Sequence, residues 1–201
     1  MNNTIIDKID KVIKDTENSA IESLNIIKAI IASQRKPDFT KIKDGDHFVY
    51  KGIEFVRLGR EQDGILCITA KIWKTRPFDK DDCNNFKKAS ICKALNNEFR
   101  LLLDDNDLRT YQINLTADNG DKAYGSFYVH VGLLSADLYR KYRKYRKYIP
   151  SYNDLVWLCT PWYCSDNANI VRGVTTSGIL YNNYASIAFG IVPACIFVEN
   201  N

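Results

Sequence analysis

The sequence lacks the motifs that the commonest classes of enzyme and metal site require. Its two histidines, His47 and His130, stand near no nucleophile or metal-ligand motif. There is no Gly-x-Ser-x-Gly, no glycine-rich phosphate loop and no His-Glu-x-x-His. These absences favour a protein that is not an enzyme, and we expect neither a cofactor nor a bound metal.

Long hydrophobic runs are also absent. The most apolar segment, residues 185–198, is interrupted by Gly190 and Pro193, whereas a membrane-spanning helix needs about 20 apolar residues. The first residues alternate isoleucine with charged residues instead of forming a secretory signal. We therefore expect no membrane span and no signal peptide, with synthesis in a cytoplasm.

Cysteine is present, but not in the spacing of a zinc site or a Cys-x-x-Cys pair. The six residues are Cys67, Cys83, Cys92, Cys159, Cys164 and Cys195. Because free cysteine is among the most buried residue types, we expect buried thiols. A redox enzyme acting through Cys159 and Cys164 is the least favoured alternative.

The strongest periodic signal lies in the N-terminal segment. Apolar residues from Ile5 to Ile31 recur every three or four positions, which lines one side of a helix. We expect this helix to form a coiled-coil stalk with a stutter near Ala20, and isoleucine at both seam positions favours a trimer over a dimer. The alternative is an amphipathic helix that packs on its own domain. The predicted seam consists of Ile6, Ile9, Ile13, Ala20, Leu24, Ile27 and Ile31.

The chain divides near Pro37, because proline cannot continue the hydrogen-bond ladder of a helix. We expect a stalk over residues 1–35, a linker over 36–45 and one domain over 46–201. The hydrophobic fraction of 45%, with 12% aromatic residues, is ample for the core of such a domain.

Within the domain, the patterns predict an α+β fold with two helices on small antiparallel sheets. Helical spacing covers residues 81–103 and 136–148, and Ser135 is placed to cap the second helix. The predicted strands are residues 47–50, 53–58, 64–73, 126–131, 156–159, 170–174, 179–181 and 191–198.

One segment, residues 139–148 (YRKYRKYRKY), alternates tyrosines with cations. Without its six cations, the 28 basic residues of the chain would fall to 22, against 24 acidic ones. The net charge of +4 therefore comes from this one patch. The composition suits an acidic partner, an anionic ligand or stacked bases. The alternative is a helix whose tyrosines pack inward while its cations face water. The candidate partner or anion patch consists of Arg140, Lys141, Arg143, Lys144, Arg146 and Lys147.

Four short motifs resemble those of an uncharacterised domain family of bacteria and phages. Residues 133–139 (LLSADLY) and 157–161 (WLCTP) are similar to its Leu-Leu-Ser-x-x-Glu-Tyr and Trp-Leu-Arg-Ser-Pro motifs. Residues 90–99 (SICKALNNEF) and 189–194 (FGIVPA) are similar to its Ser-x-x-x-x-Leu-Asn-x-x-Phe and Gly-Val-Arg-Pro-Ala motifs. Order and spacing agree from about residue 45 to the end. The chain departs from the family at Cys159, Thr160 and Val192, where the family has Arg, Ser and Arg.

This resemblance implies a C-type-lectin-like fold, which is similar to that of the variable proteins of diversity-generating retroelements. In those proteins an exposed face near the C-terminus binds the ligand. The Glu-Pro-Asn, Gln-Pro-Asp and Trp-Asn-Asp strings of calcium-dependent lectins do not occur here, so calcium-mediated glycan binding is not supported.

The span 162–184 has the tyrosine, tryptophan, asparagine and serine composition that is typical of paratopes. The alternative is that its asparagines and glycines mark turns and that Trp162 belongs to the core. The candidate ligand-binding residues are Trp162, Tyr163, Asp166, Asn167, Asn169, Arg172, Asn182, Asn183 and Tyr184.

These observations together predict a non-enzymatic binding protein, a trimeric fibre or surface-attached component of a phage virion. Its expected ligand is a cell-surface protein or glycan, bound with avidity by the repeated domain. The alternative is a structural adaptor that decorates the particle and contacts other virion proteins through residues 139–148. Nucleic acid is the less favoured partner of that segment.

Overall fold

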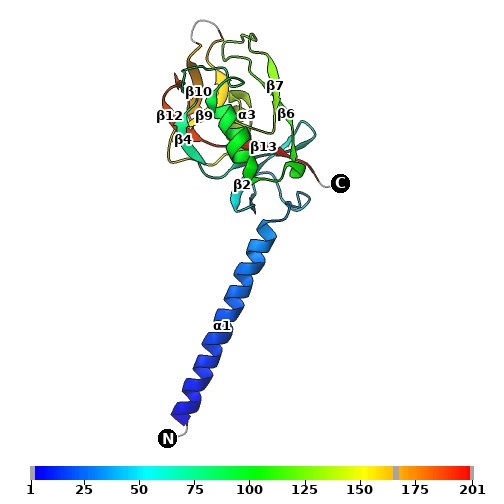
Figure 1. Cartoon of the computed structure of the whole chain (residues 1–201), viewed down its shortest axis with the longest axis vertical. Coiled ribbons are helices and arrows are strands. Elements are labelled where there is room, and N and C mark those ends of the chain that lie inside the picture. The colour runs from blue at the N-terminus through cyan, green and yellow to red at the C-terminus, as the bar shows by residue number, and fades with distance from the viewer. Residues whose placement is uncertain (1–2, 165–167, 200–201) are drawn as a thin grey trace.

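The N-terminal helix stands apart from the rest of the chain (Figure 1). The computed structural model describes residues 3–164 and 168–199, with the backbone alone for residues 3–10, 32–33 and 144–146. Helix α1 spans Asn3–Ser33, which at 1.5 Å per residue is about 46 Å. The side chains of residues 11–31 are all exposed. No described helix is both long and apolar enough to cross a membrane.

The remainder of the chain, the head, contains two larger sheets and a hairpin. The first sheet has the order β1-β2-β3-β13-β5, and β8 also pairs with β13. Its strands are β1 (His47–Tyr50), β2 (Ile53–Glu61), β3 (Gly64–Thr69), β13 (Ala194–Phe197), β5 (Leu108–Arg109) and β8 (Val131–Gly132). The predicted meander of β1, β2 and β3 is confirmed, with antiparallel pairing throughout.

The second sheet has the order β11-β10-β9-β12-β4. Its strands are β11 (Leu180–Tyr184), β10 (Ile170–Val174), β9 (Val156–Pro161), β12 (Ala188–Ile191) and β4 (Lys74–Pro77). All pair antiparallel except β9 with β12, which run parallel. A separate hairpin joins β6 (Tyr111–Asn114) to β7 (Ser126–Val129).

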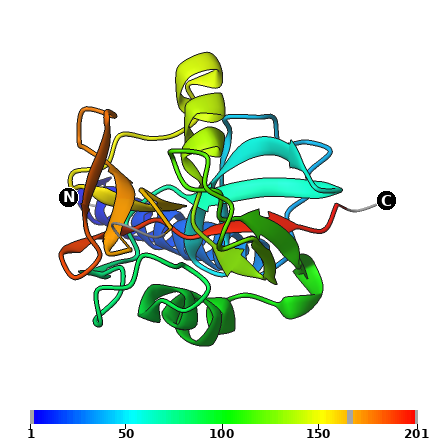
Figure 2. The same ribbon diagram turned by 90° about the horizontal axis from the view of Figure 1, so that it is seen from above.

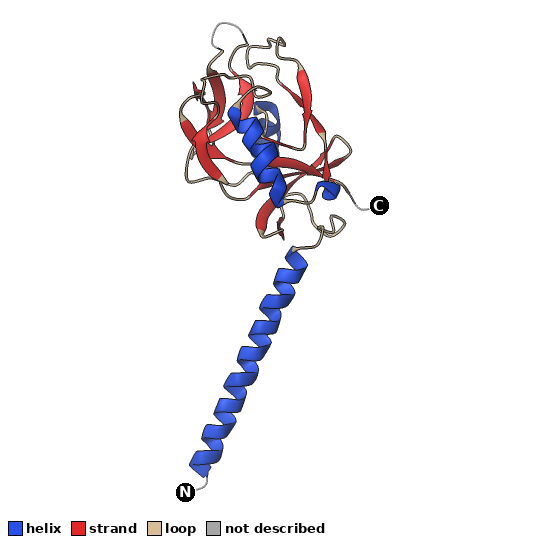
Figure 3. Cartoon of the chain, in the orientation of Figure 1, coloured by secondary structure: helices blue, strands red, loops and turns tan. Residues whose placement is uncertain are grey.

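Two short helices flank these sheets on opposite sides of the head (Figures 2 and 3). The first is α2 (Ser90–Ala94), which continues through the wider turn η1 (Leu95–Phe99) and the 3₁₀ turn η2 (Arg100–Leu102). The second is α3 (Ala136–Arg140), which continues as η4 (Lys141–Arg146). A 3₁₀ turn, η3 (Asp105–Asp107), precedes β5. The predicted α+β class is confirmed.

Ser135 caps α3 as expected, because its hydroxyl oxygen accepts a hydrogen bond from the Leu138 amide at 3.2 Å. The predicted helix over 81–103, in contrast, is wrong in its first half. The Asp79 carboxylate accepts hydrogen bonds from the amides of Asp81, Cys83 and Ser90. These bonds hold the chain in turns until Ser90, since side-chain acceptors compete with the helical ladder.

The predicted strand over 191–198 is also corrected. Pro193 interrupts it, because proline has no amide hydrogen to donate to a ladder. The two halves enter different sheets, β12 in the second and β13 in the first. The sequence patterns missed β4 and β6, which are short and rich in polar residues.

The residues predicted as a linker pack against the head. Pro37 and Phe39 are buried, and Arg57 donates to the Phe39 carbonyl at 2.7 Å and to the Asp44 carboxylate at 2.8 Å. Phe197 of β13 lies at the centre of an aromatic cluster at this junction. Its ring centroid is 5.5 to 6.0 Å from those of Phe39, Phe48, Tyr50 and Phe55.

We predict that Phe197→Ala lowers the free energy of unfolding by about 3–5 kcal/mol, because it opens a cavity among four aromatic rings. Denaturant unfolding of the full chain measures the effect. Tyr128→Ala is the control, since Tyr128 is 69% exposed on β7 and its truncation leaves stability nearly unchanged. Equal effects of the two substitutions would contradict the role assigned to Phe197.

Candidate binding face

The hairpin of β10 and β11 carries four of the nine predicted ligand-binding residues. In its register Arg172 lies opposite Asn182, Ile170 opposite Tyr184 and Val171 opposite Asn183. Since directly opposed residues share a face of a sheet, Arg172, Asn182 and Tyr184 lie on one face and Asn183 on the other. The predicted residues are therefore divided between the two faces. Asp166 and Asn167 lie outside the residues that the structure describes.

Trp162 and Arg172 form the most organised part of this region. The Arg172 guanidinium lies 4.1 Å from the centroid of the Trp162 ring, and the Tyr163 ring meets that ring edge-on at 5.5 Å. The Arg172 guanidinium also donates to the Asp118 carboxylate at 2.5 Å. Its Nε atom is buried and has no hydrogen-bond partner in the described chain. Trp162, Tyr163 and Arg172 therefore contact one another, while their role in ligand binding stays a prediction.

Asp118 lies between two guanidinium groups, because Arg140 of α3 also donates to it at 3.0 Å. Burial acts to raise the pKa of Asp118, but the hydrogen bonds and charges of Arg172 and Arg140 outweigh it and hold the pKa below its ordinary value. This ion-pair chain ties the segment that carries Asp118 to β10 and α3. Sequence reasoning missed Asp118, which is 54 residues away from Arg172 along the chain.

Asparagine side chains hold the segment before β10 in place. The Asn84 amide donates to the carbonyls of Tyr163 at 2.7 Å and Ile170 at 3.0 Å, and the Tyr124 hydroxyl donates to Asn84 at 2.7 Å. The predicted residue Asn169 donates to the Asp82 carboxylate at 3.1 Å. The Asn169 side chain thus bonds within the head. Asn84 is fully buried and fixes the backbone before β10, a role that no sequence pattern indicated.

The outermost strand, β11, presents an exposed apolar rim. Tyr184 is 53% exposed and Tyr181 46% exposed. Ile179 and Ile187, which flank the strand, are also exposed. We define the β11 rim as Ile179, Tyr181, Tyr184 and Ile187. Of these four residues, sequence reasoning identified only Tyr184, because isoleucine and tyrosine in a β-rich run are more often in the core.

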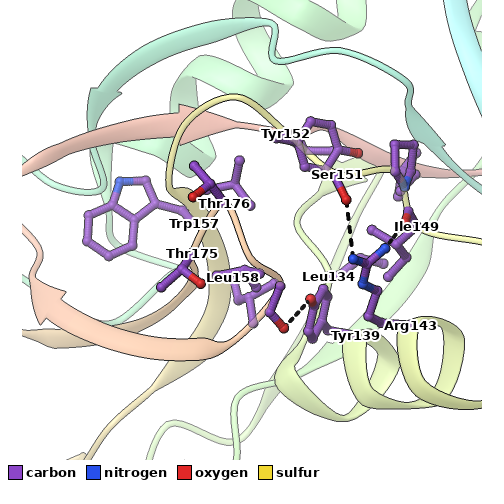
Figure 4. Close-up of a pocket in the computed structure, with 16 residues that line it drawn as sticks. Leu134, Tyr139, Arg143, Ile149, Ser151, Tyr152, Trp157, Leu158, Thr175 and Thr176 are labelled. Carbon is purple, nitrogen blue, oxygen red and sulfur yellow. Dashed lines mark hydrogen bonds between the residues drawn. The ribbon is translucent and has the colours of Figure 1, made fainter. Parts of the chain in front are cut away.

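The basic segment packs against the hairpin instead of standing free (Figure 4). Tyr139 and Tyr142 are buried, and the Tyr139 hydroxyl donates to the Gly178 carbonyl at 2.8 Å. Arg143 donates to the Ile149 carbonyl at 2.8 Å and to the Ser151 hydroxyl at 3.2 Å. Tyr139 thus connects α3 to the turn between β10 and β11, and Arg143 connects η4 to residues 149–151.

Gly178 is required in that turn, because its φ of +83° lies in the left-handed region. A Cβ atom there would also approach the Tyr139 hydroxyl at 3.2 Å and Arg143 at 3.1 Å. The cavity beneath the turn is about 20 Å³, which holds about one water molecule. This cavity is too small for a ligand, and the residues around it hold the hairpin turn in place.

The other cations of the patch have mixed environments. Arg140 is paired with Asp118 and Asp137, and Lys141 forms an ion pair with Glu61. Lys147 is exposed and ends η4 in a left-handed conformation. The side chains of Lys144 and Arg146 lie outside the described part of the structure. Of the four cations whose side chains are described, three (Arg140, Lys141 and Arg143) therefore bind groups of the head itself.

The cysteines are free thiols, as expected, and five of the six are buried. Burial raises the pKa of the Cys159 thiol to about 12 and also raises that of Cys164. Both thiols are therefore protonated at neutral pH and are poor nucleophiles. In the described ranges, no group of three or more His, Cys, Asp or Glu side chains is placed to hold a metal ion.

We compared the chain with known protein families, curated proteins and solved structures. No family model, no curated protein and no solved structure matches the chain. The fold and the site define an α+β head with an aromatic and asparagine-rich hairpin on one side, carried by a long exposed helix.

We predict that Asp118→Asn lowers the free energy of unfolding at pH 7 by about 1–3 kcal/mol, because it weakens a half-buried ion pair. Since the folded-state pKa of Asp118 is lowered, its contribution is present above the ordinary carboxyl pKa of about 4 and is lost as the pH falls through the folded value. The difference between variant and wild type should therefore shrink by pH 3, in denaturant titrations at both pH values.

Asp137→Asn is the matched control, because Asp137 also pairs with Arg140 but its side chain is 91% exposed. Exposed ion pairs contribute little to stability, so this variant should unfold like the wild type. If both substitutions have the same effect at pH 7, Asp118 does not hold the hairpin in the way described.

Proposed function

We propose that this protein is a non-enzymatic binding protein that assembles through α1 and displays the β10–β11 hairpin of each head to a ligand. The observation that carries the proposal is the exposed apolar side of α1. Val12, Ile13, Ile26, Ile27 and Ile30 are each at least half exposed in the single chain. A helix with such a side needs a partner, since burying one of these side chains stabilises by about 1.5–3 kcal/mol.

Copies of the same chain are the partner that fits best. Residues Ile13, Thr16, Ala20, Leu24, Ile27 and Ile31 recur at steps of three, four, four, three and four, which is a heptad seam with one stutter near Ala20. A second row, Val12, Ser19 and Ile26, lies beside it. The resulting apolar side is too broad for a two-stranded coil and favours three helices. Ile6 and Ile9 extend the seam in the sequence, although their side chains lie outside the described part.

A trimer would also account for the helicity of α1. Isolated helices are marginal in water, and most helical stability in proteins comes from packing. α1 is rich in isoleucine, a β-branched residue of modest helix propensity, and carries no acidic residue in its first turn and no basic residue in its last. Neither the helix propensity nor the end charges stabilise α1 strongly, so we expect packing of the seam to stabilise it.

We read the head as C-type-lectin-like. Two features support this reading: the C-terminal strand β13 pairs within the N-terminal sheet, and two helices flank the sheets (Figure 2). In this reading the motif-bearing segments are α2, α3, β9 and the turn around Pro193. The sheet edge along the β11 rim, with Tyr184 on the Arg172 face and Tyr181 on the other face, then forms the ligand site together with the adjoining Trp162.

A phage fibre or surface-attached virion component is the setting that this organisation suits. Several identical heads on a stalk convert weak contacts with a cell-surface protein or glycan into avidity. The adaptor alternative, docking through the basic segment, has less support because Arg140, Lys141 and Arg143 already bind acidic or carbonyl groups of the head. The same contacts weaken the case for nucleic acid.

Light scattering of the full chain tests the stalk. We expect a mass three times the 23.1 kDa of one chain, and we expect Ile13→Asp with Ile27→Asp to reduce it to one chain, because both charges enter the seam. The control is Asn18→Asp with Asn25→Asp, which adds the same charge to the opposite side of the helix and should keep the trimer. A wild-type monomer would contradict the proposal.

Attachment to an immobilised panel of glycans and cell-wall polymers tests the ligand site. We expect Tyr181→Ala with Tyr184→Ala to reduce attachment at least tenfold while the melting temperature stays within about 2 °C of wild type, since both rings are largely exposed. Tyr128→Ala, on the exposed β7 strand, should attach normally. If the double variant attaches as well as the wild type does, the β11 rim is not the ligand site.

A further inference from the structure

A second hollow lies on another side of the head, between the first sheet, the β6–β7 hairpin and the start of α3. It has a volume of about 190 Å³, which exceeds the roughly 150 Å³ of a cavity that holds benzene. Its apolar wall consists of Leu66, Ile113, Leu133, Leu138 and Ile196. The hollow opens to solvent beside the exposed residues Gln62, Gln112 and Asn114. The hollow is therefore a candidate binding site.

The polar groups at this hollow are neutral or already paired. Glu61 accepts hydrogen bonds from Lys141 and from the Tyr142 hydroxyl, and Gln62 exchanges two hydrogen bonds with the backbone of Gln112. A charged ligand would meet no unpaired opposite charge among the described lining residues. The site favours a neutral molecule.

Two lining groups have hydrogen-bond donors to spare. The Asn114 side-chain oxygen accepts from the amide and hydroxyl of Thr116 at 3.0 and 2.7 Å, which leaves its NH₂ group for a ligand. The Ser135 hydroxyl oxygen accepts from Leu138, which leaves its hydrogen to donate. The Asn114 NH₂ group and the Ser135 hydroxyl could both donate to an oxygen atom on the edge of an apolar ligand ring.

Cys159 of β9 forms part of the wall and is 1% exposed. Its thiol adds a soft, uncharged surface, and sulfur contacts aromatic ring edges favourably. The backbone around the hollow is closely packed, because a Cβ at Gly132 would lie 2.7 Å from the Tyr111 hydroxyl and 2.4 Å from the Ile113 side chain. The hollow is thus a formed space between fixed elements.

We propose that this hollow binds a small neutral aromatic molecule with one hydroxyl oxygen, of the phenol class, with the ring against Leu133 and Cys159 and the oxygen toward Asn114 and Ser135. This inference goes beyond the proposed binding function and depends on neither the stalk nor the β11 rim. It assigns a second, small-molecule site to each head.

The test is a titration of the full chain with 4-fluorophenol, followed by ¹⁹F NMR. We expect saturable binding with a dissociation constant of about 1 mM or tighter, and at least tenfold weaker binding of 4-fluorobenzoate, which carries a charge. Asn114→Ala should weaken phenol binding about fivefold, because one hydrogen bond is lost. Absence of saturable phenol binding, or equal binding of the benzoate, would overturn the proposal.

Cys159→Met is the filling variant, since the longer side chain enters the hollow, and it should abolish binding. Cys83→Ala is its control, because Cys83 lies in the half-exposed turn before α2 and should bind as wild type does. If Cys159→Met binds like wild type, the site is wrong. Should this variant not fold, a crystal of the wild-type chain soaked in 4-bromophenol decides: bromine in the hollow supports the site, and bromine only elsewhere refutes it.

Discussion

The exposed isoleucines of α1 are the physical constraint on which the rest of this account depends. A helix of 31 residues that leaves its apolar side in water loses the packing that stabilises most helices in proteins. We propose that a bundle of identical helices buries this side, because the seam residues carry no charge. The junction then matters, since Pro37, Phe39 and the Phe197 cluster join the helix to the head without a free linker. Each head would be held in a defined direction relative to the bundle.

Within the head, the presentation of the β10–β11 hairpin depends on contacts between segments far apart in the chain. Asp118 bridges Arg172 and Arg140, Asn84 holds the segment between β9 and β10, and Tyr139 holds the hairpin turn. These supports are buried or half-buried, whereas Tyr181 and Tyr184 are exposed. Such a division between fixed support and exposed aromatic area is the arrangement that binding surfaces use. The repeat of tyrosines and cations contributes to this support through Tyr139.

Much of the fold could be predicted from the sequence where one local pattern controls the structure. The heptad-like spacing predicted α1, the β-rich runs predicted β1, β2, β3 and β10, and Ser135 predicted the start of α3. Prediction failed where distant groups decide the outcome. Residues 81–89 have helical spacing, but the Asp79 carboxylate holds them in turns. The candidate site was predicted as a stretch of chain, yet its geometry depends on Asp118 and Asn84, which no local pattern connects to it. The hollow beside Cys159 was not predicted at all, because a space between elements has no signature in a sequence.

Amide hydrogen exchange of α1 in the full chain tests the central claim most directly. Exchange reports the local opening of each helical turn, so it distinguishes a packed stalk from a lone helix. The account predicts strong protection of the amides of residues 11–31 at a concentration where the chain is assembled, and loss of that protection when the seam is broken by Ile27→Asp while the head stays protected. Fast exchange along α1 in the wild-type chain, with a protected head, would show that nothing packs on the helix and would contradict the account.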